Sequence, residues 1–221
     1  MSNLLREKPW LIYIMLALAT SSWGSAFIAG SFATQDLSPI VVAFFRFFFA
    51  AVILIPIMIF LDKGGRRPKG SEWFLMALLG LTGIALYNIA FFIATRDAPV
   101  VKSSLFIAAN PVLITILSGL FLKEKIKGRH IAGLMIAISG AFIIITEGNV
   151  GKIIAQGFAP IDLILLLAVI CWALYSVLGK VALQRFSSIT STTYAVVLGT
   201  LMLLPLAVFD SSFSTLGEAS F

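Results

Sequence analysis

Seven long apolar stretches, separated by short polar hinges, fill this chain almost from end to end. About 20 apolar residues in a helix cross a hydrocarbon core of ~30 Å, and only helices or closed barrels satisfy the backbone inside a bilayer. The stretches are too long and too uniformly apolar for barrel strands, which alternate in runs of about ten residues. The sequence therefore predicts an all-α, polytopic membrane protein with helices over 10–33, 39–61, 72–94, 100–122, 130–146, 161–183 and 189–209.

The composition narrows the class of protein further. The chain is 60% hydrophobic and 12% charged, whereas a soluble domain carries about twice that charged fraction. The net charge of +6 does not indicate nucleic-acid binding, because the basic residues lie in short hinges rather than on one face. The sequence contains no nucleotide-binding loop, nucleophile elbow or His/Cys metal set, so we expect neither an enzyme nor a cofactor. The expected partners are a small-molecule substrate and membrane lipid, and association with a second copy of the chain is left open.

The basic residues are divided unequally between alternate hinges. Twelve of the 16 Lys and Arg residues fall on one side, and only Arg96, Lys102 and Lys152 fall on the other. Since loops rich in Lys and Arg face the cytoplasm, we predict a multi-pass protein of the inner (plasma) membrane with a cytoplasmic amino terminus.

Two parts of the chain are related by an offset of 149 residues. Trp23 and Trp172 each begin a run of polar and small residues, and Ser38 and Ser187 each stand before the next apolar segment. Five segments separate the equivalent positions, and an odd number inverts the second copy in the membrane. Inverted repeats are a common plan of secondary transporters, in which the site lies near the midplane between the copies.

Short motifs also follow one another in a fixed order along the first five segments. They are Trp23-Gly24-Ser25, Leu37-Ser38-Pro39, Phe45-Arg46-Phe47, Ala109-Asn110-Pro111-Val112, Leu122-Lys123-Glu124-Lys125, and Gly133 with Gly140. In this order they resemble the drug/metabolite transporter superfamily, EamA type.

This resemblance implies ten helices in two inverted five-helix repeats, of which the chain would hold seven. The first repeat would cover 1–147, an external linker 148–160, and an incomplete second repeat of two helices 161–221. Because these two helices would lack partner surfaces, we expect them to pack more loosely than the first five or to rest against another copy of the chain.

Arg46 is the most unusual residue of the second segment. It lies about seven residues into that segment, or ~10 Å from its start, where a charge is costly. One interpretation is that Arg46 extends to the outer headgroups among neighbouring phenylalanines. The other is that it faces the bundle interior and attracts an anionic or zwitterionic substrate.

Amide and polar aromatic side chains occur at similar depths in several segments. Asn88 and Asn110 must find hydrogen bonds inside the bundle, and Asn110 precedes Pro111, which can kink a helix. A mid-membrane indole also requires a partner. We predict that such residues face one central cavity, with Arg46 toward its outer mouth, although they could instead be interhelical staples. The predicted substrate-binding residues are Trp23, Arg46, Tyr87, Asn88, Asn110, Trp172 and Tyr175.

These observations predict a secondary active transporter that exports small organic metabolites or amino-acid-like compounds across the inner membrane by alternating access. The alternatives are a non-transporting membrane scaffold or assembly protein, and an inactive fragment of a transporter. A scaffold would not require Asn88, Asn110 and a tryptophan pair at similar depths. No acidic residue lies deep in a segment, so a carboxylate proton relay is not expected.

Overall fold

The structure is a computed structural model that describes residues 9–98, 100–124, 127–146, 149, 151, 157 and 159–210. The described residues form helices and their connections, with no strand among them. Most of the predicted linker 148–160 lies outside this part. Helices cover all seven predicted segments, as α2 (Pro9–Asp36), α3 (Pro39–Leu61), α4 (Glu72–Leu79), η1 (Gly80–Leu86), α5 (Tyr87–Asp97), α6 (Val100–Ala108), α7 (Asn110–Leu122), α8 (Gly128–Thr146), α10 (Ile161–Leu183) and α11 (Ser188–Val208).

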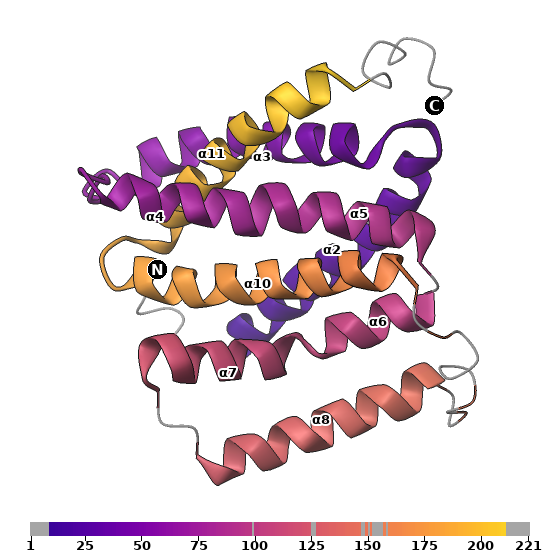
Figure 1. Cartoon of the computed structure of the whole chain (residues 1–221). Helices are drawn as coiled ribbons and strands as arrows, with labels where there is room; N and C mark the ends of the chain where they lie inside the picture. The colour runs from indigo at the N-terminus through magenta and orange to yellow at the C-terminus, as the bar shows by residue number, and fades with distance from the viewer. Residues whose placement is uncertain are drawn as a thin grey trace.

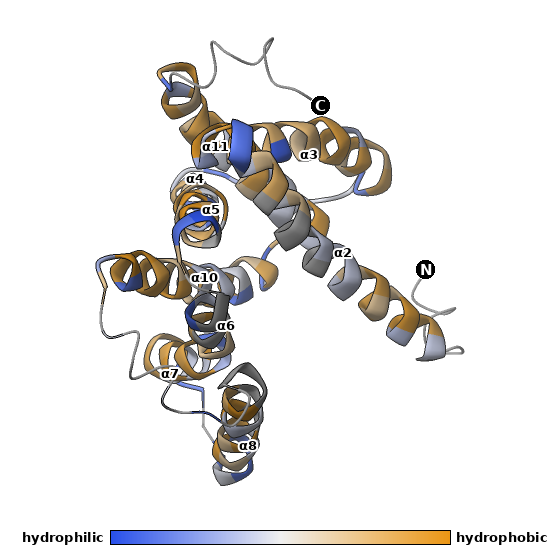
Figure 2. Cartoon of the chain, turned by 90° about the vertical axis from the view of Figure 1, so that its right-hand side faces the viewer, coloured by the Kyte–Doolittle hydropathy of each residue, from blue (hydrophilic) through white to orange (hydrophobic). Residues whose placement is uncertain are grey.

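Four helical stretches are long and apolar enough to cross a membrane. Within the described residues they are Pro39–Leu61, Glu72–Ala94, Ile161–Leu183 and Ser188–Val208, and Trp10–Ser22 and Phe106–Leu122 are shorter apolar helices. Hydrophobic residues dominate the helices in Figure 2, including the outward surfaces of α3, α7 and α8. Phe60, for example, is 67% exposed. Large apolar side chains on an outer surface suit lipid as the surrounding solvent.

Pro111 divides the fourth predicted segment into two helices. Proline has no N–H to donate to the carbonyl four residues earlier, and its ring disfavours a continuous helix. Accordingly α6 ends at Ala108 and α7 begins at Asn110, with Pro111 in its first turn and Ala109 between the two helices. The predicted kink is therefore an interruption of one residue, Ala109, which itself keeps right-handed helical dihedral angles.

Helices α3 and α11 are equivalent by sequence and pack against each other. They begin 149 residues apart, and each has an N-cap serine whose side chain accepts a hydrogen bond from the backbone three residues on. Each also contains an internal proline at the same offset, Pro56 in α3 and Pro205 in α11. The carboxylate of Asp62 at the end of α3 accepts a hydrogen bond from Thr190 in the first turn of α11 at 2.5 Å. The two helices therefore run antiparallel, as inverted copies would.

A close approach between two glycines positions α11 against the helix that contains η1. A methyl group at Gly80 would lie 2.7 Å from the backbone nitrogen of Gly199 and 2.8 Å from the carbonyl oxygen of Ala195. A methyl group at Gly199 would lie 2.4 Å from Cβ of Ile84. Because most of these neighbours are backbone atoms, only glycine fits without moving a helix. The π-helix η1 begins at this crossing.

The helices are arranged around α4–η1–α5, which lies between α10 on one side and the pair α3–α11 on the other (Figure 1). Helix α10 in turn packs against α6 and α7, while α8 packs against α6 at the edge of the bundle. Helix α2 crosses obliquely and contacts α3 and α5.

The expectation that the last two predicted segments pack loosely is wrong. Both helices contribute side chains to the core, including Leu165 and Ala173 of α10 and Val196 and Leu203 of α11, which are almost completely buried. For α11 the physical reason is the glycine crossing, since two helices without intervening side chains can approach closely. Helix α10 is held instead by its contacts with α5, α7 and η1.

Candidate functional site

A cavity of about 290 Å³ lies where α3, η1, α5, α10 and α11 meet. Gly83 and Trp172 each stand near the middle of a candidate span, so the cavity lies at a central depth. Its lining residues are Arg46, Phe47, Gly83, Ile84, Tyr87, Asn88, Phe91, Trp172, Tyr175, Thr192 and Val196.

One wall of the cavity is a row of aromatic rings from α5 and α10. Tyr87 and Phe91 follow one another at helical spacing on α5, with ring centroids 5.8 Å apart. The Tyr87 ring meets the Trp172 ring at 4.8 Å, and Trp172 meets Tyr175 at 5.6 Å. Offset and tilted ring pairs at these distances are favourable. The row therefore holds α5 and α10 together and presents a continuous apolar surface with polar edges.

The π-helix brings the Tyr175 ring into contact with the backbone of η1. A methyl group at Gly83 would lie 2.2 Å from an atom of the Tyr175 ring, so the ring occupies the space that a side chain would fill. π-Helical turns leave backbone carbonyls without their usual α-helical donors and occur often at functional sites.

Asn88 supplies donors to the carbonyls of this turn. Its side-chain amide nitrogen donates hydrogen bonds to Gly83 at 3.1 Å and to Ile84 at 3.0 Å. Asn88 is only 2% exposed, and an unpaired amide at such a site would cost several kcal/mol in hydrocarbon. Asn88 thus stabilises the π-helix from within while it lines the cavity. Both hydrogen bonds stay within its own helix, so they do not make Asn88 the interhelical staple of the alternative interpretation.

Arg46 carries the only formal charge among the lining residues at neutral pH. Its guanidinium carbon lies 5.4 Å from the centroid of the Phe47 ring and 5.9 Å from that of Phe92. The residue remains exposed, so it stands at the edge of the cavity rather than in the packed core. A cation over aromatic faces is partly stabilised by the rings and remains available to an anion.

The lining chemistry therefore suits a small organic molecule that carries a negative group. Aromatic rings offer apolar contact, a few polar groups can orient the molecule, and none of the described lining residues is a carboxylate that would repel an anion. The described residues contain no group of three or more His, Cys, Asp or Glu side chains that could hold a metal ion.

The structure brings five of the seven predicted residues to this cavity, namely Arg46, Tyr87, Asn88, Trp172 and Tyr175. Asn110 is not among them. It is 7% exposed in the first turn of α7, and its side-chain oxygen has no hydrogen-bond partner among the described residues. Trp23 lies in α2, but its side chain is outside the described part of the chain. A role in binding remains a prediction for each of the seven.

Asn110 misses the cavity because α7 lies on the far side of α10 from η1 (Figure 1). Helix α10 packs against both α7 and η1 and thus separates them. Depth alone suggested that Asn88 and Asn110 would meet, but depth does not specify which face of α10 each helix contacts.

Two lining features were not predicted from the sequence. Thr192 of α11 lines both this cavity and a smaller one of about 210 Å³ between α10 and α11, and in the sequence it is part of an ordinary Ser/Thr run. The π-helix also has no reliable local signal, although glycines at 80 and 83 followed by Asn88 mark a place where a helix can widen and a side chain can supply the donor.

A buried ion pair outside the cavity was also missed. Lys102 of α6 contacts both carboxylate oxygens of Asp162 in α10, at 2.8 and 3.1 Å, and donates to the carbonyl of Gly157 at 2.7 Å. Asp162 also accepts a hydrogen bond from the backbone of Ala159 at 2.9 Å. Lys102 and Asp162 each stand close to the start of an apolar segment. From the sequence they were expected to lie at the membrane interface, not to form a buried pair.

An exposed pair joins the opposite end of α10 to the segment after α7. Lys180 donates to Ser118 at 3.1 Å and to the carboxylate of Glu124 at 3.0 Å. The contacts between α10 and the α6–α7 segment are therefore fixed at both ends by charged side chains.

Comparison with known proteins gives a consistent family. The model of the EamA-like transporter family matches residues 10–146 and 159–218. The "Uncharacterized transporter YyaM" of Bacillus subtilis is 29% identical over 203 residues, which cover 90% of this chain and 66% of that protein. No solved structure matches the chain.

Two further relatives have names that state a substrate. The "Probable terminal-alkyne amino-acid exporter" of Streptantibioticus cattleyicolor is 32% identical over 143 residues, covering 65% of this chain and 46% of that protein. The "S-adenosylmethionine uptake transporter" of Rickettsia prowazekii is 25% identical over 201 residues, covering 90% of this chain and 64% of that protein. The chain spans two thirds or less of the length of each of these curated relatives.

Proposed function

Because the chain belongs to the EamA-like transporter family, we propose that it acts as a secondary active transporter that exports small organic metabolites or amino-acid-like compounds. The observation that carries this proposal is the central cavity, where Arg46 and the Tyr87–Trp172–Tyr175 row converge from three helices. A cation beside an aromatic wall fits a substrate with a carboxylate and an apolar side chain.

The proposed direction of transport is export, and the names of the relatives include both directions. One relative is named as an exporter of an amino acid and another as an uptake transporter of S-adenosylmethionine. Both named substrates are amino-acid derivatives, and each carries the carboxylate that Arg46 would attract. The proposed class of substrate is therefore an amino acid or a related carboxylate, with a side chain that the aromatic row can cover.

The proposed mechanism is alternating access between two inverted repeats, with residues 1–147 as the first and 161–221 as the start of the second. Support comes from α3 and α11, which have equivalent caps and prolines and run antiparallel. The cavity lies at the contact between these parts, as expected for a site between repeats. We also propose seven crossings of the inner membrane with the amino terminus in the cytoplasm.

The proposal is tested by binding and transport with matched variants. Purified protein in lipid vesicles is offered a set of radiolabelled amino acids, together with their methyl esters, which lack the negative charge. Arg46→Gln is expected to weaken binding of the free acids by roughly 10-fold or more, the value of a charged hydrogen bond, and to leave the esters unchanged. Arg129→Gln removes an exposed cation far from the cavity and serves as the control.

A second pair of variants tests the aromatic wall. Trp172→Ala removes a ring from the cavity, whereas Trp73→Ala removes a ring that meets Tyr194 outside the cavity, with centroids 5.1 Å apart. We expect only Trp172→Ala to lower uptake into inverted vesicles at unchanged folded yield. If both variants lose transport in proportion to folded yield, the cavity residues are structural staples and the scaffold alternative is favoured.

A further inference from the structure

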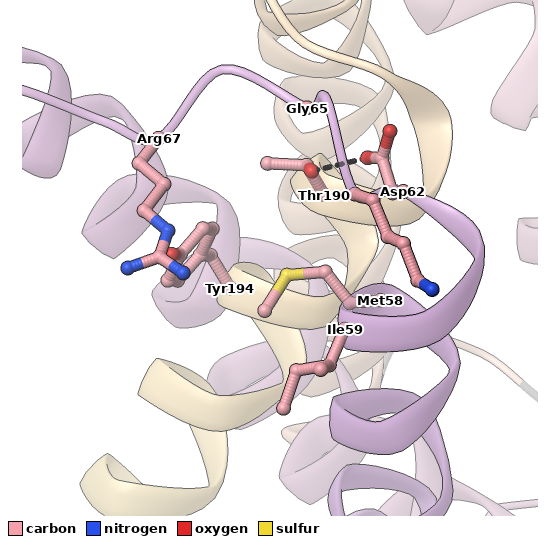
Figure 3. Close-up of a pocket in the computed structure, with 8 residues that line it drawn as sticks. Met58, Ile59, Asp62, Gly65, Arg67, Thr190 and Tyr194 are labelled. Atoms are coloured by element: carbon pink, nitrogen blue, oxygen red, sulfur yellow. Dashed lines mark hydrogen bonds between the residues drawn. The ribbon is translucent and has the colours of Figure 1, made fainter.

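A separate cavity of about 250 Å³, which shares no lining residue with the central one, lies at the junction of α3 and α11 (Figure 3). Met58 and Ile59 from the last turn of α3 and Tyr194 of α11 form its apolar side. Lys63 and Arg67, from the segment that follows α3, form its charged side. The cavity thus combines an apolar wall and two cations at one end of a candidate span.

The segment that carries the two cations is held in place by Asp62. The Asp62 carboxylate accepts hydrogen bonds from Ser187 and, at 2.5 Å, from Thr190, at the start of α11. Gly65 donates its N–H to the Asp62 carbonyl at 2.8 Å. A side chain at Gly65 would lie 2.5 Å from the Asp62 carboxylate, so the tight turn requires glycine. The cavity is therefore a built feature and not a gap beside a free loop.

The charge of the acidic residue in this cavity is already satisfied. Asp62 accepts two hydroxyl donors at the positive end of the α11 dipole, which favours an anion there. These hydrogen bonds, that of Ser187 first, hold the pKa of Asp62 below its usual value. Its negative charge therefore opposes a second anion less than an unpaired carboxylate would.

Lys63 and Arg67, in contrast, form no ion pair with any described residue. Two other cations nearby are engaged, since Arg66 contacts Glu72 at 2.7 Å and Arg185 approaches the same carboxylate at 3.6 Å. Two exposed, unpaired cations that flank one cavity create a local excess of positive charge. This excess lies on the side that the distribution of Lys and Arg predicts to be cytoplasmic.

The apolar wall continues onto a surface that faces outward from the bundle. Ile59 and Phe60 are both exposed on the last turn of α3. Because the candidate span of α3 ends at Leu61, the cavity lies where hydrocarbon gives way to headgroups. A ligand that binds there can place its charged part between the cations and its apolar part along α3.

From this geometry we infer a binding site for an anionic phospholipid, whose phosphate lies between Lys63 and Arg67 and whose acyl chains lie against Met58 and Ile59. Basic pockets between transmembrane helices at the cytoplasmic face bind anionic headgroups by this combination of charges. A soluble phosphate would use the cations but not the apolar wall, so the wall favours a lipid. The bound lipid would fasten the end of α3 to the start of α11.

The inference is tested by measuring lipid retention with matched variants. The protein is placed in nanodiscs of phosphatidylcholine containing one-fifth phosphatidylglycerol, and bound lipids are counted by native mass spectrometry. The double variant Lys63→Gln/Arg67→Gln is expected to bind phosphatidylglycerol on the order of 25-fold more weakly, from about 1 kcal/mol for each cation near a membrane surface. Phosphatidylcholine should be retained equally by both proteins.

The control is Lys127→Gln/Arg129→Gln, which removes two exposed cations from another hinge on the same predicted side of the membrane. We expect this protein to retain phosphatidylglycerol as the unchanged protein does. Equal losses in both double variants would overturn the site in favour of diffuse attraction by surface charge.

Two further measurements separate lipid from other sources. Glycerol 3-phosphate should fail to displace the bound lipid, and displacement at millimolar concentration would indicate a soluble phosphate ligand and overturn the assignment to lipid. Ile59→Asn keeps both cations but makes the wall polar, and it should also lower retention. Unchanged retention in Ile59→Asn would show that the wall takes no part. All the substituted side chains are exposed, and melting temperatures equal to that of the unchanged protein in phosphatidylcholine alone would show that the variants fold.

Discussion

Breaking the Lys102–Asp162 pair should destabilise the protein strongly when one partner is removed and weakly when both are. Lys102 is 7% exposed and Asp162 is 4% exposed, so neither charge can recover its water on losing the other. The Lys102 ammonium donates to both carboxylate oxygens and to Gly157, which uses its three donors. The pair connects α6 to α10.

The expected magnitudes follow from these contacts. Removing one member of a buried pair costs about 3–5 kcal/mol, because the other is left buried and unpaired. Asp162→Asn should fall at about 3 kcal/mol, the lower end, since Lys102 keeps the Gly157 carbonyl at 2.7 Å. Lys102→Met should cost a similar amount, because Asp162 keeps only the N–H of Ala159. The double variant Lys102→Met/Asp162→Asn removes both charges and should lie within about 1 kcal/mol of the unchanged protein.

The assay is the free energy of unfolding, measured by titration with sodium dodecyl sulphate in mixed micelles for the two single variants and the double variant. The difference between the double variant and the sum of the singles gives the coupling energy. The reasoning would be refuted if each single variant cost less than about 1 kcal/mol and the two added without coupling, since that is the behaviour of a solvated pair.

Three other outcomes are expected from the same structure. Gly199→Ala should lower the free energy of unfolding by about 1–3 kcal/mol, because its methyl group would lie 2.4 Å from Cβ of Ile84. The control Gly179→Ala, at a glycine with open space around it, should change the free energy of unfolding by under about 0.5 kcal/mol. Equal effects of the two substitutions would contradict the close crossing. Asn88→Leu should cost about 1–2 kcal/mol through the loss of two hydrogen bonds, and a melting temperature no lower than that of the unchanged protein would contradict their role. Since hydrogen bonds lower the pKa of Asp62 below 3.8, its ionised form should stabilise the folded protein fully above that pH, and this stabilisation should be lost as the pH falls further. Asp62→Asn should therefore remove the fall in melting temperature that acid causes over this pH range. An unchanged fall in the variant would show that another group causes it.

The local and periodic features of this protein were determined by the sequence itself. A run of apolar residues about as long as a bilayer is thick specifies a helix wherever it is placed, so all seven predicted segments are helical. Ser38 and Ser187 cap helices because their side chains reach a backbone N–H three residues on. Pro111 interrupts its segment because it lacks a donor. Each of these consequences depends on neighbours within one or two turns.

Burial of the amides could also be predicted, because hydrocarbon provides no hydrogen bonds to an exposed amide. Asn88 and Asn110 are both buried. Asn88 has the expected hydrogen bonds, whereas the side-chain oxygen of Asn110 has no partner among the described residues. The aromatic candidates on α5 and α10 were found for a related reason, since polar handles on rings at mid-depth need partners. What the residues touch was a different question, which their depth did not answer.

Only the tertiary structure decided which residues meet. The close approach of Gly80 and Gly199 fixes how α11 lies against η1, and contacts with α5, α7 and η1 make α10 central as well. Helix α10 separates Asn110 from the cavity and brings Asp162 to Lys102 across 60 residues of sequence. Hydrophobic length sets only that each helix forms, since lipid is as apolar as a neighbouring helix and gives no preference for one partner. The rotation and pairing of the helices depend on side-chain shape at contacts that are distant in the chain, and these contacts create the cavity.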